Sequence, residues 1–554
     1  MRKSLVLACL ATLFSLSALA GEGFLKGKIL KIDMQDAVSE RGGSSISLGL
    51  GGLSSSSSLS LLSVERALEK AVDDDDIAMI YMNYDHFRVG MASAEEIRGI
   101  LRDFSAKGKP VVAYGASLDN GSYYLASTAD RIFMHPKGGG ALTGLGTTQF
   151  FVKDLLDTLG IDIQLIRHGK FKSAGEMYIR NDISPENREQ YEALLGSIWG
   201  GMVAEMAESR GKSSEEIMAM VDGLKLSTAQ TWIDNGLIDG LKYRDEMETY
   251  LAHLFGTDKP SDVKTVSLKE YIKDLKKGPS GKKVAVIYAD GEIVRSSGDI
   301  VGEKLARQIA SVRRDSTVKA VVFRVNSPGG EVVAADIIRR EIELLGKVKP
   351  VVASYGSYAA SGGYLISAGC SKIFVDNATL TGSIGVFGVV RSIGRAVHKN
   401  LKINMVSVGT NAHTDMTSGA RPLNEEELAW YQTEIEGIYD DFVGIVAEGR
   451  SMDKSAVDDI AQGRVWSGKD ALGLGLADEK GNLLNAVKYA AGLRKLGKYR
   501  IAVYPEKKSL KDKLSGNDKP DDNLVRIQDL LSPGFNTIAR MPFVTIDSPK
   551  NTVK

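Results

Sequence analysis

The sequence feature that most constrains the fold is a long internal repeat. Val111-Val112-Ala113 in the first half matches Val351-Val352-Ala353 in the second half, at an offset of 240 in residue number. Three further matches keep this offset: Lys109-Pro110 with Lys349-Pro350, Tyr124-Leu125 with Tyr364-Leu365, and Tyr191 with Tyr431. A repeat of this length is a whole domain rather than a solenoid unit. The chain is therefore predicted to contain one domain fold twice.

Each copy shows the same alternation of strand and helix patterns. In the second copy, Val284–Ala289 and Ala320–Val325 are apolar runs typical of buried strands. Leu305, Ile309 and Val312 fall on one helical face between them, and a second helix is expected over 332–345. Continuous apolar strands that alternate with helices favour a parallel sheet covered on both faces. We expect an α/β fold in tandem.

The domain boundaries follow from this repeat within the 554 residues. We predict an N-terminal domain over 21–275, a linker over 276–283, a C-terminal domain over 284–503 and a polar tail over 504–554. Residues 42–60, rich in serine and glycine, are expected to form a flexible loop or an exposed patch.

The first twenty residues have the pattern of a secretory signal. Arg2 and Lys3 precede a short apolar run over 5–16, and Ala18-Leu19-Ala20 resembles a cleavage site. The sequence therefore predicts an exported protein. An uncleaved membrane anchor at 1–20 remains the alternative.

The amino-acid composition argues against several classes of function. Lys plus Arg and Asp plus Glu are both 70, so no basic field points to nucleic acid. Once the signal is removed, Cys370 is the one cysteine left, which allows no internal disulfide. The six histidines are scattered without metal-ligand spacing. We expect no metal and no cofactor.

Ser361 is the first candidate for chemistry. It lies in a small-residue turn, Tyr358–Tyr364, between a strand-like run and a helix-like run. The start of a helix offers unpaired N–H groups and the positive end of the helix dipole. A serine nucleophile needs such groups where an oxyanion forms beside it. An ordinary helix-capping serine is the alternative, and the turn by itself leaves both open.

A glycine loop follows the neighbouring strand. Asn326-Ser327-Pro328-Gly329-Gly330 comes directly after the buried run that ends at Val325. Two loops that follow successive strands of a parallel sheet meet at its carboxyl edge, where such sheets bind ligands. We predict that N–H groups of Gly329, Gly330 and Gly362 form an oxyanion hole. A plain strand-to-helix turn is the alternative for this loop.

A serine nucleophile also needs a base. The next histidine after Ser361 is His398, and no Asp-His arrangement suggests itself. A lysine whose pKa is lowered by burial can take this role instead. The first copy offers Lys172, after a strand-like run over 163–166. At the offset of the repeat, Lys172 aligns with Ala412 and Ser361 with Gly121, so each copy lacks what the other has. One site built from both copies is the economical interpretation, and a surface lysine is the alternative.

Four motifs in this tandem arrangement resemble a known family. Ala-Ser-Gly-Gly-Tyr, Asn-Ser-Pro-Gly-Gly, Leu-Thr-Gly-Ser-Ile-Gly and Phe-Lys-Ser-Ala look like those of signal peptide peptidase A, the long tandem-domain bacterial form of the protease IV family. The likeness runs from about Leu59 to Leu493 and includes Gly463–Gly468 and Gly475–Asp478.

The resemblance implies a fold and a site. It implies a tandem duplication of a Clp-protease/crotonase-like ββα domain. It also implies a Ser-Lys dyad with Ser361 as nucleophile and Lys172 as general base, and a Ser383 that hydrogen-bonds the lysine amine. No cofactor takes part in such a site.

The resemblance further implies a biological setting. The family forms a homotetramer on the periplasmic side of the inner membrane and degrades cleaved signal peptides and other unfolded hydrophobic peptides. Family members of this length usually begin with a longer anchor than residues 1–20 offer, so the mode of membrane association stays open. Two rivals also remain: an acyl-CoA enzyme of the crotonase type, and an inactive scaffold that only binds peptides.

Overall fold

The computed structural model describes residues 25–33, 36–49, 52–85, 89–275, 278–279, 281–505 and 536–540. The predictions for residues 1–20 and for most of the tail lie outside these ranges. The described chain divides into two compact units. Unit 1 comprises the residues up to 145 and those from 199 to 275, and unit 2 comprises residues 146–198 and those from 278 onward. A segment of the first sequence copy thus belongs to the same unit as the second copy.

Unit 2 is built on a sheet whose central strands are parallel. β11 (Lys283–Asp290), β14 (Val318–Ser327) and β16 (Val351–Ala360) lie side by side in that order. β22 (Arg500–Tyr504) extends the sheet beside β11, and β18 (Leu380–Gly382) extends it beside β16. The buried residues of the three central strands are mostly apolar, as a sheet covered on both faces requires.

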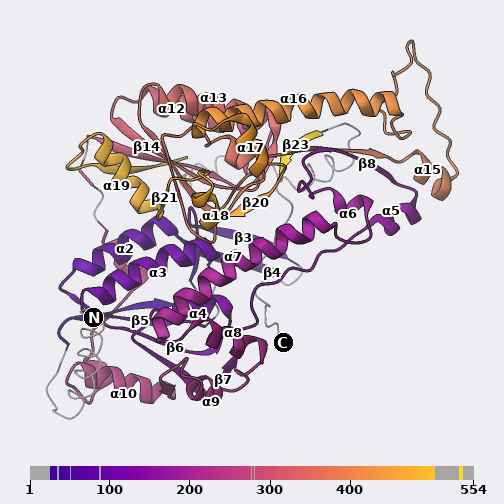
Figure 1. The fold of residues 1–554 in the computed structure, drawn as a ribbon. Helices are drawn as coiled ribbons and strands as arrows, with labels where there is room; N and C mark the ends of the chain where they lie inside the picture. The colour runs from indigo at the N-terminus through magenta and orange to yellow at the C-terminus, as the bar shows by residue number, and fades with distance from the viewer. Residues whose placement is uncertain are drawn as a thin grey trace. The chain divides into compact units, whose positions relative to one another are not determined.

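Helices cover this sheet. α12 (Gly302–Arg314) and α13 (Val332–Gly346) run next to each other along it (Figure 1). Leu305, Ile309 and Val312 of α12 are buried, as the sequence pattern predicts. α19 (Leu483–Leu493) packs on β14 and β16. The buried faces of α12 and α13 and the sheet form one continuous core.

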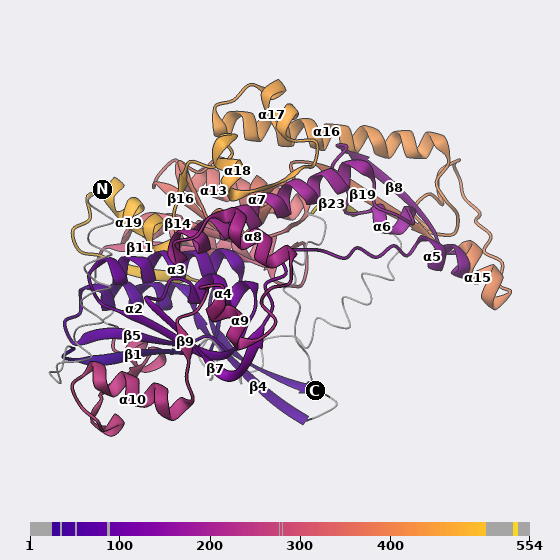
Figure 2. The same ribbon diagram turned by 60° about the horizontal axis from the view of Figure 1, so that its bottom comes forward.

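A second sheet of unit 2 combines segments that are far apart in sequence. Its order is β13-β12-β15-β23-β19-β8. β8 (Asp162–His168) pairs antiparallel with β19 (Val386–Ser392) along the whole length of both strands. The short helices α5 (Lys153–Leu159) and α15 (Gly394–Leu401) lie side by side at the far end of this pair (Figure 2). The remaining strands are β12 (Ile293–Val294), β13 (Ile300–Val301), β15 (Gly329–Glu331) and β23 (Asn536–Arg540).

Unit 1 is also a parallel sheet covered by helices. The strand order is β10-β1-β5-β6-β7-β9, and every pairing in it is parallel. The strands are β1 (Lys28–Asp33), β5 (Ile77–Asn83), β6 (Val111–Leu118), β7 (Arg131–Gly140), β9 (Gly240–Leu241) and β10 (Thr265–Ser267). α2 (Leu61–Asp73) and α3 (Met91–Ala106) pack against each other and bury apolar stripes.

The elements repeat at the offset of the sequence motifs. β6 begins at Val111 and β16 at Val351, the first pair of matched residues in the repeat. α7 (Pro185–Arg210) and α16 (Glu425–Arg450) are both 26 residues long, and their first residues differ by the same offset. α4 (Asn120–Ala126) occupies in the first copy the place of α14 (Gly362–Leu365) in the second. The predicted tandem α/β fold is confirmed.

Residues 42–60 differ from the expected loop. β3 (Gly43–Gly49) and β4 (Gly52–Ser60) form an antiparallel pair, which β2 (Ala37–Ser39) extends. Ile46 and Leu48 alternate with serine here, and this period of two also fits a strand. The prediction of a loop was therefore wrong, whereas the alternative of an exposed patch stays a prediction. Within the described residues, no helix combines the length and the apolar character needed to cross a membrane.

Candidate active site

Ser361 occupies a strained turn at the end of a buried strand. β16 ends at Ala360, α14 starts at Gly362, and Ser361 between them has φ 54° and ψ −120°. Positive φ is rare for residues with a side chain and costs about 1–3 kcal/mol, so it persists where the surroundings enforce it. The Ser361 N–H donates to the Gly382 carbonyl at 2.8 Å. Such strain at a fully buried serine is typical of functional sites.

Close packing around Gly363 sets the direction of this turn. A Cβ atom on Gly363 would lie 2.5 Å from the Ser327 carbonyl oxygen, so this position excludes any side chain. The hydroxyl of Tyr364 donates to the Leu476 carbonyl at 2.9 Å and fixes the short helix α14 to the core. The Ser361 turn and the glycine loop after β14 are therefore in direct contact.

Lys172 reaches Ser361 from the first sequence copy. Its amine lies 2.8 Å from Ser361 Oγ, 2.9 Å from Ser383 Oγ and 3.0 Å from the Ser383 carbonyl oxygen. All three residues are fully buried. The structure thus brings together Ser361, Lys172 and Ser383, which are separated by up to 211 residues in sequence.

Burial favours the neutral form of the Lys172 amine. Loss of hydration lowers the pKa of Lys172 well below its ordinary value of 10.5. A neutral amine has one lone pair and two N–H donors. Its lone pair can accept the proton of the Ser361 hydroxyl while its N–H groups donate to the oxygens of Ser383. The arrangement suits proton transfer from serine to lysine.

Glycines on two segments make room for the lysine. Gly169 has φ 102°, and a Cβ there would lie 2.5 Å from the carbonyl group of Gln462. Gly463 has φ 78°, and a Cβ there would lie 2.6 Å from the N and Cβ atoms of Lys172. The Phe171 N–H donates to the Gln462 carbonyl at 2.9 Å. The backbone of the lysine loop therefore rests directly on the turn at 462–463.

The same turn also supports Ser383. The Ser383 N–H donates to the Arg464 carbonyl at 2.6 Å, and the Gly463 N–H donates to the Ile384 carbonyl at 2.8 Å. The Arg464 guanidinium lies over the rings of Phe171 and Trp466, 4.7 Å and 4.4 Å from their centroids. Residues 463–466 thus tie the lysine loop to the serine that contacts the lysine amine.

A buried carboxylate orders the other side of the lysine loop. Arg167 donates to the Lys172 carbonyl at 2.8 Å and to Glu176 at 3.1 Å. Glu176 is 1% exposed and accepts a hydrogen bond from the Ser184 hydroxyl at 2.8 Å. Sequence reasoning did not single out Arg167 or Glu176, because no periodicity or motif distinguishes them from surface charges.

The predicted oxyanion glycines lie beside the Ser361 turn. Ser327 pairs with Ala359 in the sheet, which places the two loops next to each other. Gly329 and Gly330 have φ 102° and 156°, and a Cβ on Gly330 would lie 1.9 Å from the Ile293 carbonyl oxygen. The Gly329 N–H donates to Ser327 Oγ at 3.2 Å and is thus engaged within its own loop. Gly362 starts α14, whose first turn leaves its N–H groups without intrahelical partners.

Comparison with known proteins agrees with the repeat. Peptidase family S49 matches residues 103–257 and again residues 343–497, so the two matches are related by the offset of the repeat. The chain is 34% identical to "Protease 4" of Salmonella typhi, across 89% of this chain and 80% of that protein. It is 34% identical to "Protease 4" of Haemophilus influenzae, across 83% and 75%. It is 32% identical to "Serine protease SPPA, chloroplastic" of Arabidopsis thaliana, across 84% and 69%.

Proposed function

The chain belongs to peptidase family S49 and is a serine-type peptidase, and from this premise we propose that Ser361 and Lys172 form its catalytic dyad. The observation that carries the proposal is the buried contact of 2.8 Å between the Lys172 amine and Ser361 Oγ. A lysine with a lowered pKa beside a strained serine is the combination that an activated hydroxyl nucleophile needs.

The proposed reaction has two steps. The neutral amine of Lys172 takes the Ser361 proton as Oγ attacks the scissile carbonyl carbon, and the protonated amine then gives this proton to the leaving amine. In the second step, Lys172 takes a proton from water as the water oxygen attacks the acyl-enzyme ester. The protonated amine then gives this proton to Ser361 Oγ as the ester bond breaks, which releases the new carboxyl group and restores the free serine. The Ser383 hydroxyl and carbonyl orient the amine throughout.

The oxyanion of each tetrahedral intermediate needs N–H donors. We assign this role to Gly330 and Gly362, one from each of the two adjoining loops. Gly329, the third glycine of the sequence prediction, donates to Ser327 Oγ and shapes the loop instead. The N–H groups at the start of the helix α14, where Gly362 lies, carry a positive partial charge.

The proposed substrates are cleaved signal peptides and other unfolded hydrophobic peptides. This proposal rests on the motif resemblance, as does the proposed working place on the periplasmic side of the inner membrane. We also propose a homotetramer on the same ground. The N-terminal pattern at 1–20 supports export.

Digestion of a synthetic signal peptide tests the proposed function. Purified protein should cleave the peptide, and Ser361→Ala should reduce cleavage to the background rate while the protein stays folded. An acyl-CoA thioester and a folded protein serve as comparison substrates and should remain intact. Hydrolysis of the thioester without peptide cleavage would favour the crotonase-type alternative and contradict the proposal.

A further inference from the structure

The long helix α16 lies along the strand that leads to Lys172. β8 ends at His168, shortly before Lys172, and α16 packs against this strand (Figure 2). Gln164, Ile166 and His168 alternate along β8, so their side chains lie on one face of the strand. Ile166 is buried in the same core as Ile435 of α16. This face of β8 is therefore covered by α16.

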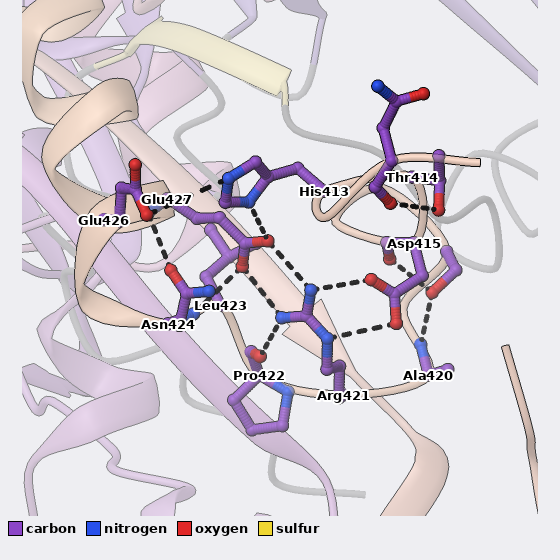
Figure 3. Close-up of polar contacts among 12 residues, drawn as sticks. His413, Thr414, Asp415, Ala420, Arg421, Pro422, Leu423, Asn424, Glu426 and Glu427 are labelled. Carbon is purple, nitrogen blue, oxygen red and sulfur yellow. Dashed lines mark hydrogen bonds and ion pairs between the residues drawn. The ribbon is translucent and has the colours of Figure 1, made fainter. Parts of the chain in front are cut away.

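The start of α16 is fixed to the first half of β8. The Gln164 side chain donates to the Leu423 carbonyl at 2.9 Å and accepts from the Leu423 N–H at 2.7 Å. Leu423 precedes the N-cap residue Asn424, which forms a capping box with Glu427. The Arg421 guanidinium donates to Glu427 at 2.8 Å (Figure 3). These contacts hold one end of the helix beside the strand.

Tyr439 of α16 contacts the other end of the same strand. Its ring is stacked on the His168 ring, with the two centroids 3.7 Å apart and the planes 18° from parallel. His168 Nδ1 lies 2.5 Å from Oε2 of Glu436, which precedes Tyr439 by about one helical turn. Tyr439 is 5% exposed. The end of β8 is thus held by a buried ring.

The hydroxyl of Tyr439 contacts a second segment of the site. It donates to Asp458 of α17 (Lys454–Ile460) and accepts from the Gln462 backbone N–H at 3.3 Å. The Gln462 side chain completes this cluster by donating to Asp458 at 2.6 Å and to the Tyr439 hydroxyl at 3.3 Å. Burial and the hydrogen bond to Asp458 raise the pKa of Tyr439, so the hydroxyl keeps the proton that it donates.

The backbone of Gln462 is strained and carries the lysine loop. Its φ is 50°, in the region that residues with a side chain rarely adopt. Its carbonyl accepts from the Phe171 N–H at 2.9 Å, and the next residue, Gly463, lies against Lys172. The Tyr439 hydroxyl therefore binds the N–H of a strained residue whose carbonyl binds the lysine loop.

The first copy of the repeat lacks this polar pair. At the offset of 240, Tyr439 corresponds to Trp199 and Asp458 corresponds to Met218. The Trp199 indole N–H donates to the Met218 sulfur at 3.2 Å, so the two positions are in contact in both copies. The fold of the repeat therefore does not require a tyrosine and an aspartate at these positions. They occur in the copy whose turn at 462–463 contacts the lysine loop.

We propose that Tyr439 is a positioning residue for Lys172. Its ring fixes the end of β8 and its hydroxyl fixes the turn at 462–463, so the lysine loop is held from both segments. The inference rests on the proposed role of Lys172 as the base. A loop held in this way keeps the amine beside Ser361 Oγ and keeps water away from it.

Exclusion of water is the link between this support and the chemistry. Loss of hydration lowers the pKa of Lys172, and the hydrogen bonds of its amine go to Ser361 and Ser383. A change that admits water should therefore raise the pKa of Lys172 towards its ordinary value. The charged and titratable groups on the elements packed around the lysine loop include Arg167, His168, Glu176, Glu436, Asp458 and Arg464.

Tyr439→Phe tests the hydroxyl and keeps the stacked ring. We expect kcat for a synthetic signal peptide to fall about tenfold with KM nearly unchanged, because the change acts on the base and not on peptide binding. The pH at half-maximal kcat should rise by about one unit, since water then reaches the amine. Partial unfolding would lower the amount of active protein but would not move this pH.

Variants of the hydroxyl's partner sharpen this test. Asp458→Leu removes the acceptor and should reproduce both effects, whereas Asp458→Asn keeps an oxygen acceptor and should stay within about twofold of the parent. Combining Tyr439→Phe with Asp458→Leu should add little to either single change, because both break the same cluster. Tyr489→Phe, on the exposed side of α19, is the matched control and should leave kcat and its pH dependence unchanged.

Two substitutions of His168 test the ring contact. His168→Phe keeps a flat ring against Tyr439 and removes the nitrogen that faces Glu436, so it should retain most of kcat. His168→Ala removes the ring, and it should lower kcat and raise the pH at half-maximal activity as Tyr439→Phe does. Equal kcat in these two variants would overturn the part of the proposal that concerns the ring.

The proposal is overturned if Tyr439→Phe keeps the kcat and the pH dependence of the parent, or if its kcat falls while the pH at half-maximal activity stays the same. Labelling of Ser361 by a fluorophosphonate separates this failure from that of the proposed function. Labelling of Lys172→Met at the wild-type rate would mean that Lys172 is not the base, and the dyad would fail together with the inference. If Lys172→Met loses labelling while Tyr439→Phe keeps the wild-type rate at every pH, the dyad stands and the positioning role alone is contradicted.

Discussion

At the scale of single residues, the site depends on one buried lysine. Water would stabilise the ammonium form of Lys172, and the folded protein withholds this water while offering oxygens of Ser361 and Ser383. The low pKa therefore destabilises the folded state whenever the unfolded chain can charge the same amine. If Lys172 is the proposed base, its function and the stability of the fold place opposite demands on this residue.

This opposition predicts a pH-dependent difference in stability. The pKa of Lys172 is lower in the folded than in the unfolded state, so between these two values the unfolded state binds more protons and stability rises with pH. Compared with Lys172→Met, the wild type should gain about 1.4 kcal/mol in free energy of unfolding per pH unit in this window, which ends near 10.5. Denaturant unfolding between pH 7.5 and 10 measures this difference. If the free energies of unfolding of the wild type and of Lys172→Met change with pH in the same way, the pKa of Lys172 is not lowered by folding.

Ser383 offers a second test at the residue scale. Ser383→Ala removes one oxygen from the amine and should lower kcat/KM roughly ten- to hundredfold, since a lost buried hydrogen bond costs about 1–3 kcal/mol. This oxygen also stabilises the charged amine, so the pH midpoint of activity should move to lower pH. If activity falls but the pH at half-maximal activity does not change, Ser383 contributes to packing and does not affect the charge of the amine.

At the scale of elements, the site is held by turns in which single positions, such as Gly169 and Gly463, have no room for a side chain. The lysine loop, the Ser383 turn and the turn at 462–463 interlock through backbone contacts. Their strain is offset by the apolar core beneath β14 and β16. The geometry of the proposed site thus depends on the backbone as much as on the side chains.

Gly463→Ala should disrupt this arrangement. Its Cβ would lie 2.6 Å from the Lys172 backbone at a φ of 78°, so we expect at least a hundredfold loss of activity and a lower melting temperature. Gly473→Ala is the matched control, because a Cβ there meets no atom within 4 Å. Similar activity in both variants would show that the turn at 462–463 does not position the lysine.

For the second copy, the sequence predicted which helices and strands are present better than it predicted the residues at which they begin and end. The helices at 302–314 and 332–346 and the strands at 283–290 and 318–327 contain the expected ranges. The serine turn and the lysine loop were visible because glycines and small residues mark them. Arg167, Glu176 and the role of Gly463 were not visible, because their function depends on contacts that no local pattern encodes. β23 escaped prediction for the same reason, since it forms a strand only beside β15 and β19.

At the scale of the whole molecule, the two residues of the proposed dyad come from different copies of the repeat. The first sequence copy carries Lys172 and the second carries Ser361, yet both lie in one compact unit. Residues 146–198 leave the unit formed by the rest of the first copy and pack with the second. The sequence established the division of residues between copies, but only tertiary contacts reveal that one segment crosses over.

This arrangement predicts the outcome of mixing two inactive variants. Because Lys172 and Ser361 meet within one chain, co-expressed Ser361→Ala and Lys172→Met chains should form mixed assemblies without any peptidase activity. Mass spectrometry of the assemblies confirms that both variants are present. Recovered activity, up to a fraction of the wild-type rate, would mean that the dyad forms between chains.

The dyad itself is tested most directly by the rate at which a fluorophosphonate probe labels Ser361. The wild-type chain should be labelled at Ser361, with a rate that rises with pH through the lowered pKa of Lys172. Lys172→Met keeps an unbranched apolar side chain that ends at Cε but removes the amine that acts as the base, and its labelling rate should fall at least about a hundredfold at every pH. Labelling of Lys172→Met at the wild-type rate, or of a different serine, would contradict the Ser361–Lys172 dyad.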